Sequence, residues 1–369
     1  MADNLNNVPS DADELPRGFH WLEVANIRDE TCEAKSITFN IPEELAEIYS
    51  YIEGQYLTLT REFDGERLRR PYSLWTAPQE GKLSICSKKI VGGRMSSFIN
   101  EQLKVGDKLA VMKPMGRFYR ANDNEGSNNR YVMIAGGSGI TPVMSNIRTI
   151  LQKQPDATVT LIYGNRTVES IIFREQLADM KNQFMDRFEL FHILSQEQSD
   201  LEIFNGQLDG AKLEHLLSTL LDINNIDHFF ICGPGQMMEG ATHTLQEMGI
   251  GEDCITVESF GDQITPITTE ITDSDEIKTV ATVILGGIKT EVKMREGEKV
   301  LDAALAAKLD LPYACRGGVC CTCKALLVEG EVAMDVNYGL EDEEVERGFV
   351  LTCQSHPISD KVVLDFDAV

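Results

Sequence analysis

Several features that define other protein classes are missing from this 369-residue chain. It has no apolar run of membrane-spanning length, and even Val280–Ile288 is far too short. Met1–Pro16 lacks the basic start and apolar core of a secretory signal, and its polar, acidic composition predicts a disordered tail. We therefore expect a cytoplasmic protein with no membrane segment.

Positive charge and histidine are both scarce. Lysine and arginine total 34 against 59 acidic residues, which gives a formal net charge of −25. Such a chain repels phosphates, so we expect no nucleic-acid partner. The charge mainly favours solubility and is compatible with a partner that carries a basic patch. The six histidines are scattered without a ligand-type pair, so a histidine metal site is not expected.

The nine cysteines are concentrated near the C-terminus, where five fall within residues 315–353. Four of them follow the plant-type spacing for a 2Fe-2S cluster, Cys-x4-Cys-x2-Cys with a distant fourth thiolate. The four-iron pattern Cys-x2-Cys-x2-Cys-x3-Cys-Pro is absent, only one close pair suggests zinc, and disulfides are uncommon inside cells. The predicted metal ligands are Cys315, Cys320, Cys323 and Cys353.

The residues between these cysteines suit a tight loop. Gly317 and Gly318 let the backbone fold closely around the sulfides and point N–H groups at them. Cys321 is predicted to be a small side chain that points away from the cluster. An alternative ligand register that uses Cys321 stays open.

Length and composition predict two or three soluble domains, with 42% hydrophobic and 25% charged residues. Short strands separated by turns fill the first hundred residues, with one helix at Met95–Gln102, and this spacing predicts an antiparallel barrel. The expected strands are Phe19–Ile27, Lys35–Ile41, Gln55–Arg61, Leu68–Trp75, Lys82–Lys88 and Lys108–Lys113.

Two motifs in this region suit a phosphate-bearing ring cofactor. Arg70-Pro71-Tyr72-Ser73 lies on a strand, where alternation sends Arg70 and Tyr72 to one face and Ser73 to the other. Gly92-Gly93-Arg94-Met95-Ser96-Ser97 places two glycines and a serine cap at a helix start, as anion sites do. Each motif alone is weak, because a strand tyrosine usually packs and a Gly-Gly pair usually turns.

After Arg130 the pattern changes to alternating strands and helices, which predicts a doubly wound parallel sheet. The first strand leads into Gly136-Gly137-Ser138-Gly139-Ile140-Thr141-Pro142 and a helix at Val143–Gln152, the geometry that cradles a dinucleotide pyrophosphate. Pro142 replaces the usual third glycine and suits a first helical turn. The expected strands are Tyr131–Ala135, Thr158–Tyr163, Phe188–Leu194, His228–Cys232 and Cys254–Phe260.

Two later segments concern the nucleotide. Cys232-Gly233-Pro234-Gly235 ends a strand, where ligands bind in open α/β sheets, although a buried cysteine there is often only structural. The second strand ends without the acidic residue that binds ribose hydroxyls in many NAD sites. Arg166 is available there for a 2′-phosphate, so NADPH is favoured over NADH, while the nearby Glu169 keeps NADH possible.

Together these motifs resemble the ferredoxin–NADP reductase family. The resemblance implies FAD held by Arg70 and Gly93, Met95 and Ser96 at its pyrophosphate, by Tyr72 against the isoalloxazine, and by Ser73 near its reactive nitrogen. Pro71 belongs to the same motif. It also implies Cys232, Gly233 and Pro234 beside the nicotinamide, and Glu258 or Phe260 near the flavin, although both can equally be ordinary strand-end residues.

The last segment resembles plant-type ferredoxins, with strands at Thr279–Leu285, Lys289–Met294 and Lys361–Phe366 and a helix at Val300–Ala307. This is a β-grasp pattern of the α+β class. The expected divisions are a disordered acidic tail (1–16), an FAD-binding barrel (17–125), an NAD(P)-binding domain (126–261), a linker (262–278) and a 2Fe-2S ferredoxin domain (279–369).

Within reductases of this domain order, residues 313–320, 332–338, 348–354 and 363–367 are similar to the reductase subunits of ring-1,2-phenylacetyl-CoA epoxidases. This resemblance implies an NAD(P)H-dependent reductase that passes electrons through FAD and a 2Fe-2S cluster to a di-iron oxygenase. The cluster edge near Arg316–Cys321 would face that partner. The open alternatives are a steroid, aromatic-ring or fatty-acyl oxygenase as acceptor, or a non-catalytic redox sensor.

Overall fold

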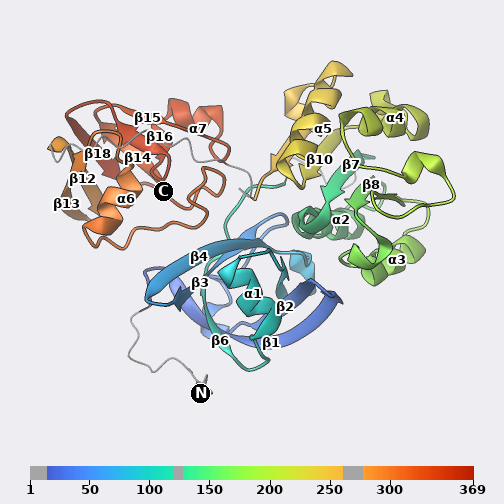
Figure 1. Cartoon of the computed structure of the whole chain (residues 1–369), viewed down its shortest axis with the longest axis horizontal. Coiled ribbons are helices and arrows are strands. Elements are labelled where there is room, and N and C mark those ends of the chain that lie inside the picture. Colours follow the sequence, from blue (N-terminus) through green and yellow to red (C-terminus); the bar gives the residue numbers. More distant parts are fainter. Residues whose placement is uncertain (1–14, 120–127, 261–276) are drawn as a thin grey trace. The chain divides into compact units, whose positions relative to one another are not determined.

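The computed structural model describes residues 15–119, 128–260 and 277–369 (Figure 1). Most of residues 20–259 form one compact unit, and residues 277–369 belong to a second. The tail expected at residues 1–16 and the linker expected at 262–278 lie almost entirely outside the described residues. The first strand of the second unit begins at Ile277, so the last two residues of the expected linker are strand residues.

The first unit begins with a six-stranded sheet in the order β4-β3-β6-β1-β2-β5. A bridge between Leu74 and Ile85 connects its two edges and closes the barrel, so the edges are not left unpaired. The interior is filled by aliphatic side chains such as Leu22, Ile37 and Leu57. The elements are β1 Phe19–Thr31, β2 Ala34–Asn40, β3 Tyr56–Phe63, β4 Glu66–Ser73, β5 Leu83–Lys88, α1 Arg94–Glu101 and β6 Lys108–Met112.

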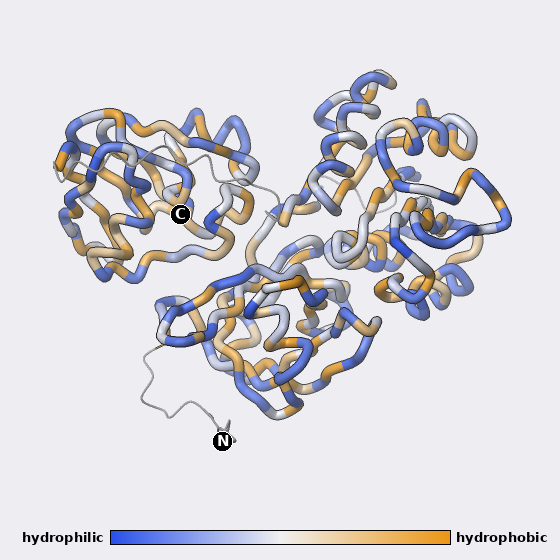
Figure 2. Tube along the Cα trace, in the orientation of Figure 1, coloured by the Kyte–Doolittle hydropathy of each residue, from blue (hydrophilic) through white to orange (hydrophobic). Residues whose placement is uncertain are grey.

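A five-stranded parallel sheet forms the rest of this unit, in the order β11-β10-β7-β8-β9. Its central strands are apolar along almost their whole length because helices flank the sheet (Figure 2). The first strand, β7, pairs with both β8 and β10, so the strand order reverses beside it. The elements are β7 Arg130–Gly136, α2 Ile140–Lys153, β8 Thr158–Asn165, α3 Arg174–Gln183, β9 Phe188–Leu194, α4 Gly210–Leu220, β10 His228–Cys232, α5 Gly235–Glu247 and β11 Ile255–Glu258.

The second unit is a β-grasp fold, with sheet order β13-β12-β18-β14-β16 and a separate pair, β15 with β17. Its core includes Val283, Leu301 and Leu351, which α6 and the sheet enclose between them. The elements are β12 Ile277–Leu285, β13 Ile288–Arg295, α6 Val300–Ala306, β14 Lys324–Glu329, β15 Val332–Met334, α7 Asp342–Glu346, β16 Phe349–Leu351, β17 Ser355–Pro357 and β18 Lys361–Asp365.

The three predicted fold classes are confirmed, and most element boundaries agree within a few residues. The first strand, β1, extends to Thr31 rather than Ile27. Helix α2 begins at Ile140 rather than Val143 because Thr141 and Pro142 already belong to its first turn. The elements from β14 to β17 and α7 are not among the predicted ones. The three-residue strands β15, β16 and β17 and the five-residue helix α7 carry too little periodicity to be recognised.

Candidate functional site

The Arg70–Ser73 motif occupies the end of β4, and burial increases along it. Arg70 is exposed, Tyr72 is half-buried against the barrel core, and Ser73 is buried. The Arg70 guanidinium donates to the neighbouring carbonyl of Arg69. Alternation along β4 places Arg70 and Tyr72 on one face and Ser73 on the other, so a cation, an aromatic ring and a hydroxyl lie close together on the strand, which suits a phosphate and a flat ring.

Ser73, Cys232 and Glu258 form a polar cluster at the boundary of the barrel and the parallel sheet. Cys232 ends β10 directly beside Glu258, its register partner on β11. The Ser73 hydroxyl donates to the Glu258 carboxylate at 3.4 Å. Burial raises the pKa of Glu258 to about 8, and burial next to Glu258 raises the pKa of the Cys232 thiol. This cluster can hold a proton near neutral pH.

The predicted phosphate loop lies against the segment that contains Cys232. A Cβ on Gly139 would lie 2.1 Å from the Cys232 carbonyl oxygen, and one on Gly136 would lie 2.7 Å from Pro234. Gly137 has a φ of +52°, which favours glycine. The loop is a short 3₁₀ turn, Gly137–Gly139, that leads directly into α2. The backbone amides at this helix start therefore lie at the point where the strand order reverses, a usual position for nucleotides.

Three further predicted residues of this loop lie close together. The Thr141 hydroxyl donates to the Ser138 carbonyl at 2.8 Å, and Pro142 occupies the first turn of α2. Gly233 packs equally tightly, because a Cβ on it would lie 3.0 Å from the amide nitrogen of Gly136. These contacts fix the loop geometry around the two strand ends.

Lys88, at the end of β5, was not predicted as a site residue. Its ammonium lies 3.8 Å from the position that a Cβ on Gly137 would occupy. Burial lowers the pKa of Lys88, and the Arg166 guanidinium lowers it further. No sequence pattern indicated this contact, since Lys88 belongs to a barrel strand far from the loop in the chain. An anion on the loop would pair with this cation.

Arg166 follows the end of β8 and pairs with Glu33 in the β1–β2 turn. Its guanidinium lies 2.7 Å from the Glu33 carboxylate, and both side chains are about half exposed. Arg166, which is predicted to bind the 2′-phosphate of NADPH, is therefore already paired with the Glu33 carboxylate, and the phosphate would compete with it.

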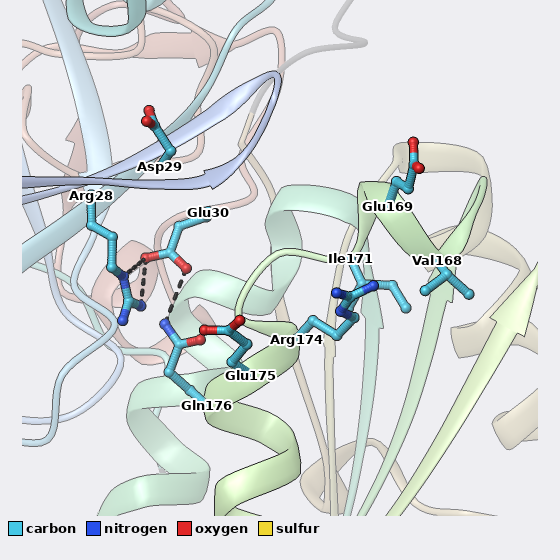
Figure 3. A pocket seen from close by; sticks show the side chains of 9 residues that line it. All are labelled: Arg28, Asp29, Glu30, Val168, Glu169, Ile171, Arg174, Glu175 and Gln176. Carbon is cyan, nitrogen blue, oxygen red and sulfur yellow. Dashed lines mark hydrogen bonds and ion pairs between the residues drawn. The ribbon is translucent and has the colours of Figure 1, made fainter.

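Glu169, the residue that keeps NADH possible, lies elsewhere. It lines a cavity of about 260 Å³ between β1 and the segment that leads into α3 (Figure 3). The cavity is organised by Glu30, which accepts hydrogen bonds from Arg28, Ser36 and Gln176, and burial raises the pKa of Glu30. The lining residues are Arg28, Asp29, Glu30, Val168, Glu169, Ile171, Arg174, Glu175 and Gln176.

The Gly92–Ser97 segment departs from its prediction in one respect. Gly93 is the N-cap of α1, and no side chain of the described residues caps the helix, so the expected serine cap is wrong. The Ser96 hydroxyl instead donates to the Gly93 carbonyl and accepts from the Ile90 amide, which folds the loop onto itself. Met95 is buried in the barrel core, so only its backbone can reach a phosphate.

The four predicted cluster cysteines lie in two pairs within the second unit. Cys315 interacts with Cys320, and Cys323 interacts with Cys353. A hydrogen bond from Cys315 lowers the pKa of Cys320 to about 6, and one from Cys323 lowers the pKa of Cys353. Two pairs of thiolates match the two irons of a 2Fe-2S cluster. In the parts of the chain that the structure describes, no three acidic, histidine or cysteine side chains are grouped to hold a single metal ion.

The loop that carries these cysteines curls through left-handed residues. Arg316, Gly318 and Cys321 have φ values of +57°, +78° and +48°. The amide of Gly317 donates to the Cys315 sulfur at 3.3 Å, so this glycine segment directs one backbone N–H at the sulfur of a predicted ligand. The Cys321 thiol donates to the Gly339 carbonyl, so its sulfur is engaged away from the two pairs.

Phe260 is half-buried and follows β11 immediately after Ser259. In the ranges 15–119, 128–260 and 277–369, no helix is long and apolar enough to cross a membrane.

Three family models match the chain in the order of its folds. The oxidoreductase FAD-binding domain matches residues 22–119, the oxidoreductase NAD-binding domain matches residues 133–243, and the 2Fe-2S iron-sulfur cluster binding domain matches residues 283–357. The chain therefore binds FAD, a pyridine nucleotide and a 2Fe-2S cluster.

Relatives of known activity match nearly the whole chain. It is 43% identical over 351 residues to a subunit of the 1,2-phenylacetyl-CoA epoxidase of Escherichia coli, covering 95% of this chain and 98% of that protein. It is 33% identical over 369 residues to the ferredoxin reductase component of 3-ketosteroid-9-alpha-monooxygenase from Mycobacterium tuberculosis, covering 95% and 98% of the two chains.

Solved structures share the fold. Phthalate dioxygenase reductase aligns with 95% of this chain and 98% of its own, at a TM-score of 0.58 and 22% identity. An intact type IV self-sufficient cytochrome P450 monooxygenase aligns with 94% of this chain and 41% of its own, at a TM-score of 0.68 and 21% identity.

Proposed function

The chain belongs to the ferredoxin–NADP reductase family, in the branch that carries a 2Fe-2S ferredoxin domain, and we propose that it reduces the di-iron oxygenase component of a phenylacetyl-CoA epoxidase. It is an oxidoreductase that transfers electrons from NAD(P)H through FAD to the cluster. The observation that carries the proposal is the 43% identity to a component of such an epoxidase over nearly the full length of both chains.

When bound, FAD accepts a two-electron hydride from the nucleotide and the cluster carries single electrons onward. The protein's residues position these groups and control protons. We assign Arg70, Pro71 and Tyr72, with Gly93, Met95 and Ser96, to FAD. The exposed Arg70 supports a phosphate contact, and the half-buried Tyr72 supports a ring contact.

Ser73, Cys232 and Glu258 are assigned to the reacting end of the flavin and nicotinamide. The contact between the Ser73 hydroxyl and the Glu258 carboxyl supports this assignment, because the pair can hold a proton at a partly buried position. Phe260 remains a candidate only by its position two residues after Glu258.

The nucleotide is assigned to the loop and helix start that carry Gly136, Gly137, Ser138, Gly139, Thr141 and Pro142, beside Gly233 and Pro234. Lys88 would neutralise its pyrophosphate. Arg166 would bind a 2′-phosphate, which favours NADPH, and the phosphate would have to displace Glu33. An exposed ion pair of this kind is weak enough for a dianion to replace it.

Cys315, Cys320, Cys323 and Cys353 are assigned as cluster ligands, and the surface around Arg316–Cys321 as the exit to the acceptor. We place the protein in the cytoplasm. The net charge of −25 supports a basic docking surface on the acceptor.

The test uses the purified protein with the epoxidase oxygenase component, phenylacetyl-CoA and NADPH, and measures epoxide formation and flavin reduction together. The proposal expects epoxide at a rate that depends on both proteins. Flavin reduction without epoxide would refute the assigned acceptor while leaving the reductase activity intact.

A second acceptor is a ketosteroid monooxygenase, supported by the 33% identity to its reductase component. The same assay with that oxygenase and a 3-ketosteroid distinguishes the two candidate acceptors, since specific docking should make electron transfer to one of them faster. Product from the steroid oxygenase alone would favour this second candidate. The sensor hypothesis is set aside, since the relatives named above are enzyme components.

A further inference from the structure

A buried amide lies directly behind one of the assigned cluster ligands. Gln354 follows Cys353 and is 3% exposed. Its side-chain nitrogen lies 3.6 Å from the Cys353 sulfur and donates to the Arg316 carbonyl at 2.9 Å. One NH₂ group thus connects the fourth ligand to the left-handed residue that follows the first ligand, Cys315.

Lys299 determines which end of this amide faces the sulfur. Its ammonium donates to the Gln354 side-chain oxygen at 3.3 Å. An ammonium can only donate and a backbone carbonyl can only accept, so Lys299 and Arg316 together allow a single orientation of the amide. In that orientation the NH₂ group points at the Cys353 sulfur.

Lys299 is itself held by buried polar groups. It lies 3.2 Å from the carboxylate of Asp335, whose side chain is 7% exposed, and His356 lies 3.3 Å from the same carboxylate. The Asp335 amide donates to the Gln354 carbonyl at 3.0 Å, and β15 and β17 pair Ala333 with His356. The orientation of the amide is therefore fixed by the fold.

We propose that Gln354, oriented by Lys299, is a positioning residue that raises the reduction potential of the cluster by donating to the Cys353 sulfur. One added electron places more negative charge on the sulfurs, so a fixed donor stabilises the reduced form more than the oxidised form. The charge of Lys299 is balanced by the Asp335 carboxylate. We therefore attribute the change in reduction potential to the orientation of the Gln354 amide and not to the positive charge of Lys299. The inference rests on the proposed ligand set.

The experiment is a reductive titration of the full-length protein followed by electron paramagnetic resonance of the reduced cluster. Gln354→Met keeps the side-chain length and removes the donor. It should shift the one-electron equilibrium about tenfold toward the oxidised cluster, a midpoint about 59 mV lower. A midpoint equal to that of the wild type, with full cluster content, would overturn the proposal.

Variants of Lys299 test the orientation of the Gln354 amide without changing Gln354, which is adjacent in the chain to the assigned ligand Cys353. Lys299→Met should lower the midpoint, and Lys299→Arg, which keeps the donor, should restore it. Lys361→Met is the matched control, since it removes one lysine from an exposed pair with Glu329 in the same domain, and it should leave the midpoint unchanged. The proposal would be contradicted if Lys361→Met lowered the midpoint potential of the cluster as much as Lys299→Met does.

Failure of the ligand assignment gives a different result. A wild-type protein without the 2Fe-2S signal, or with an unaltered signal after Cys353→Ala, would refute the ligand set. Unchanged midpoints with a normal signal would refute only the role of Gln354.

Discussion

At the scale of single residues, the site depends on side chains whose partners come from distant parts of the chain. Glu258 is an ordinary strand-end carboxylate in the sequence, yet burial raises its pKa to about 8, against the opposing effect of the hydrogen bond from Ser73. Arg166 is an isolated cation in the sequence, yet Glu33 pairs with it. The properties of both residues follow from these partners.

Glu258 should make the protein less stable as the pH rises. Its pKa is near 4.5 when unfolded and about 8 when folded, so the folded state holds an extra proton between these values. The free energy of unfolding should therefore fall from about pH 5 to pH 8, by at most about 1.4 kcal/mol per pH unit. Urea unfolding of the wild type and Glu258→Gln across this range measures the difference. Parallel pH profiles for the two proteins would contradict the prediction.

The pair of Glu33 and Arg166 should control nucleotide preference. Arg166→Ala should lower kcat/KM for NADPH about tenfold more than for NADH, because a charge-assisted contact to the 2′-phosphate is lost. Glu33→Gln should raise kcat/KM for NADPH about two- to fivefold by releasing Arg166. Glu175→Gln, in the separate cavity, is the matched control and should change neither value. Equal effects of Arg166→Ala on both nucleotides would exclude a 2′-phosphate site at Arg166.

At the scale of elements, the nucleotide loop is shaped by its contact with the end of β10. Gly139 lies against the backbone of Cys232 and Gly233, and Gly136 lies against the Pro234 and Met237 side chains, so neither position has room for a Cβ. Gly137 has a positive φ. The nucleotide site is therefore formed jointly by the ends of β7 and β10 and the start of α2.

Gly139→Ala should disrupt this element. Its Cβ would lie 2.1 Å from the Cys232 carbonyl oxygen, so the loop and β10 must separate. We expect a loss of about 1–3 kcal/mol in stability and at least a tenfold loss of nucleotide affinity. Gly164→Ala is the control, since the nearest atoms to its Cβ would be the Leu208 side chain at 3.2 Å and the Ala135 carbonyl oxygen at 3.8 Å, with no contact under 3.0 Å. Calorimetric nucleotide titration and thermal unfolding measure both effects; retained affinity in Gly139→Ala would show that the contact does not shape the site.

At the scale of the whole molecule, three folds in one chain provide a path from a two-electron donor to a one-electron carrier. Along the chain the FAD-binding domain comes first, the NAD-binding domain second and the 2Fe-2S domain last. Electrons flow from the nucleotide to FAD and then to the cluster, so only the first two domains are reversed relative to the electron path. A net charge of −25 extends over the whole chain and acts on any partner at long range.

The rate of electron delivery to the oxygenase should fall with salt. If the acceptor's docking surface is basic, raising the ionic strength from about 50 mM to about 300 mM should lower the rate about threefold or more. Stopped-flow oxidation of the reduced protein by the oxygenase measures this. A small uncharged quinone serves as the control acceptor and should show little salt dependence. A protein acceptor that is equally insensitive to salt would exclude electrostatic steering.

Patterns within the chain were enough to identify the three fold classes and the cluster candidates. Strand spacing, the glycine turn before a helix and the spacing of Cys315, Cys320, Cys323 and Cys353 are local patterns, and local patterns can be recognised without knowledge of contacts. The partners of the site residues came from the tertiary structure. Lys88 reaches Gly137, Glu33 reaches Arg166, and Lys299 reaches Gln354 across 49, 133 and 55 positions. Such contacts depend on how strands are ordered in a sheet, and no local pattern encodes that order.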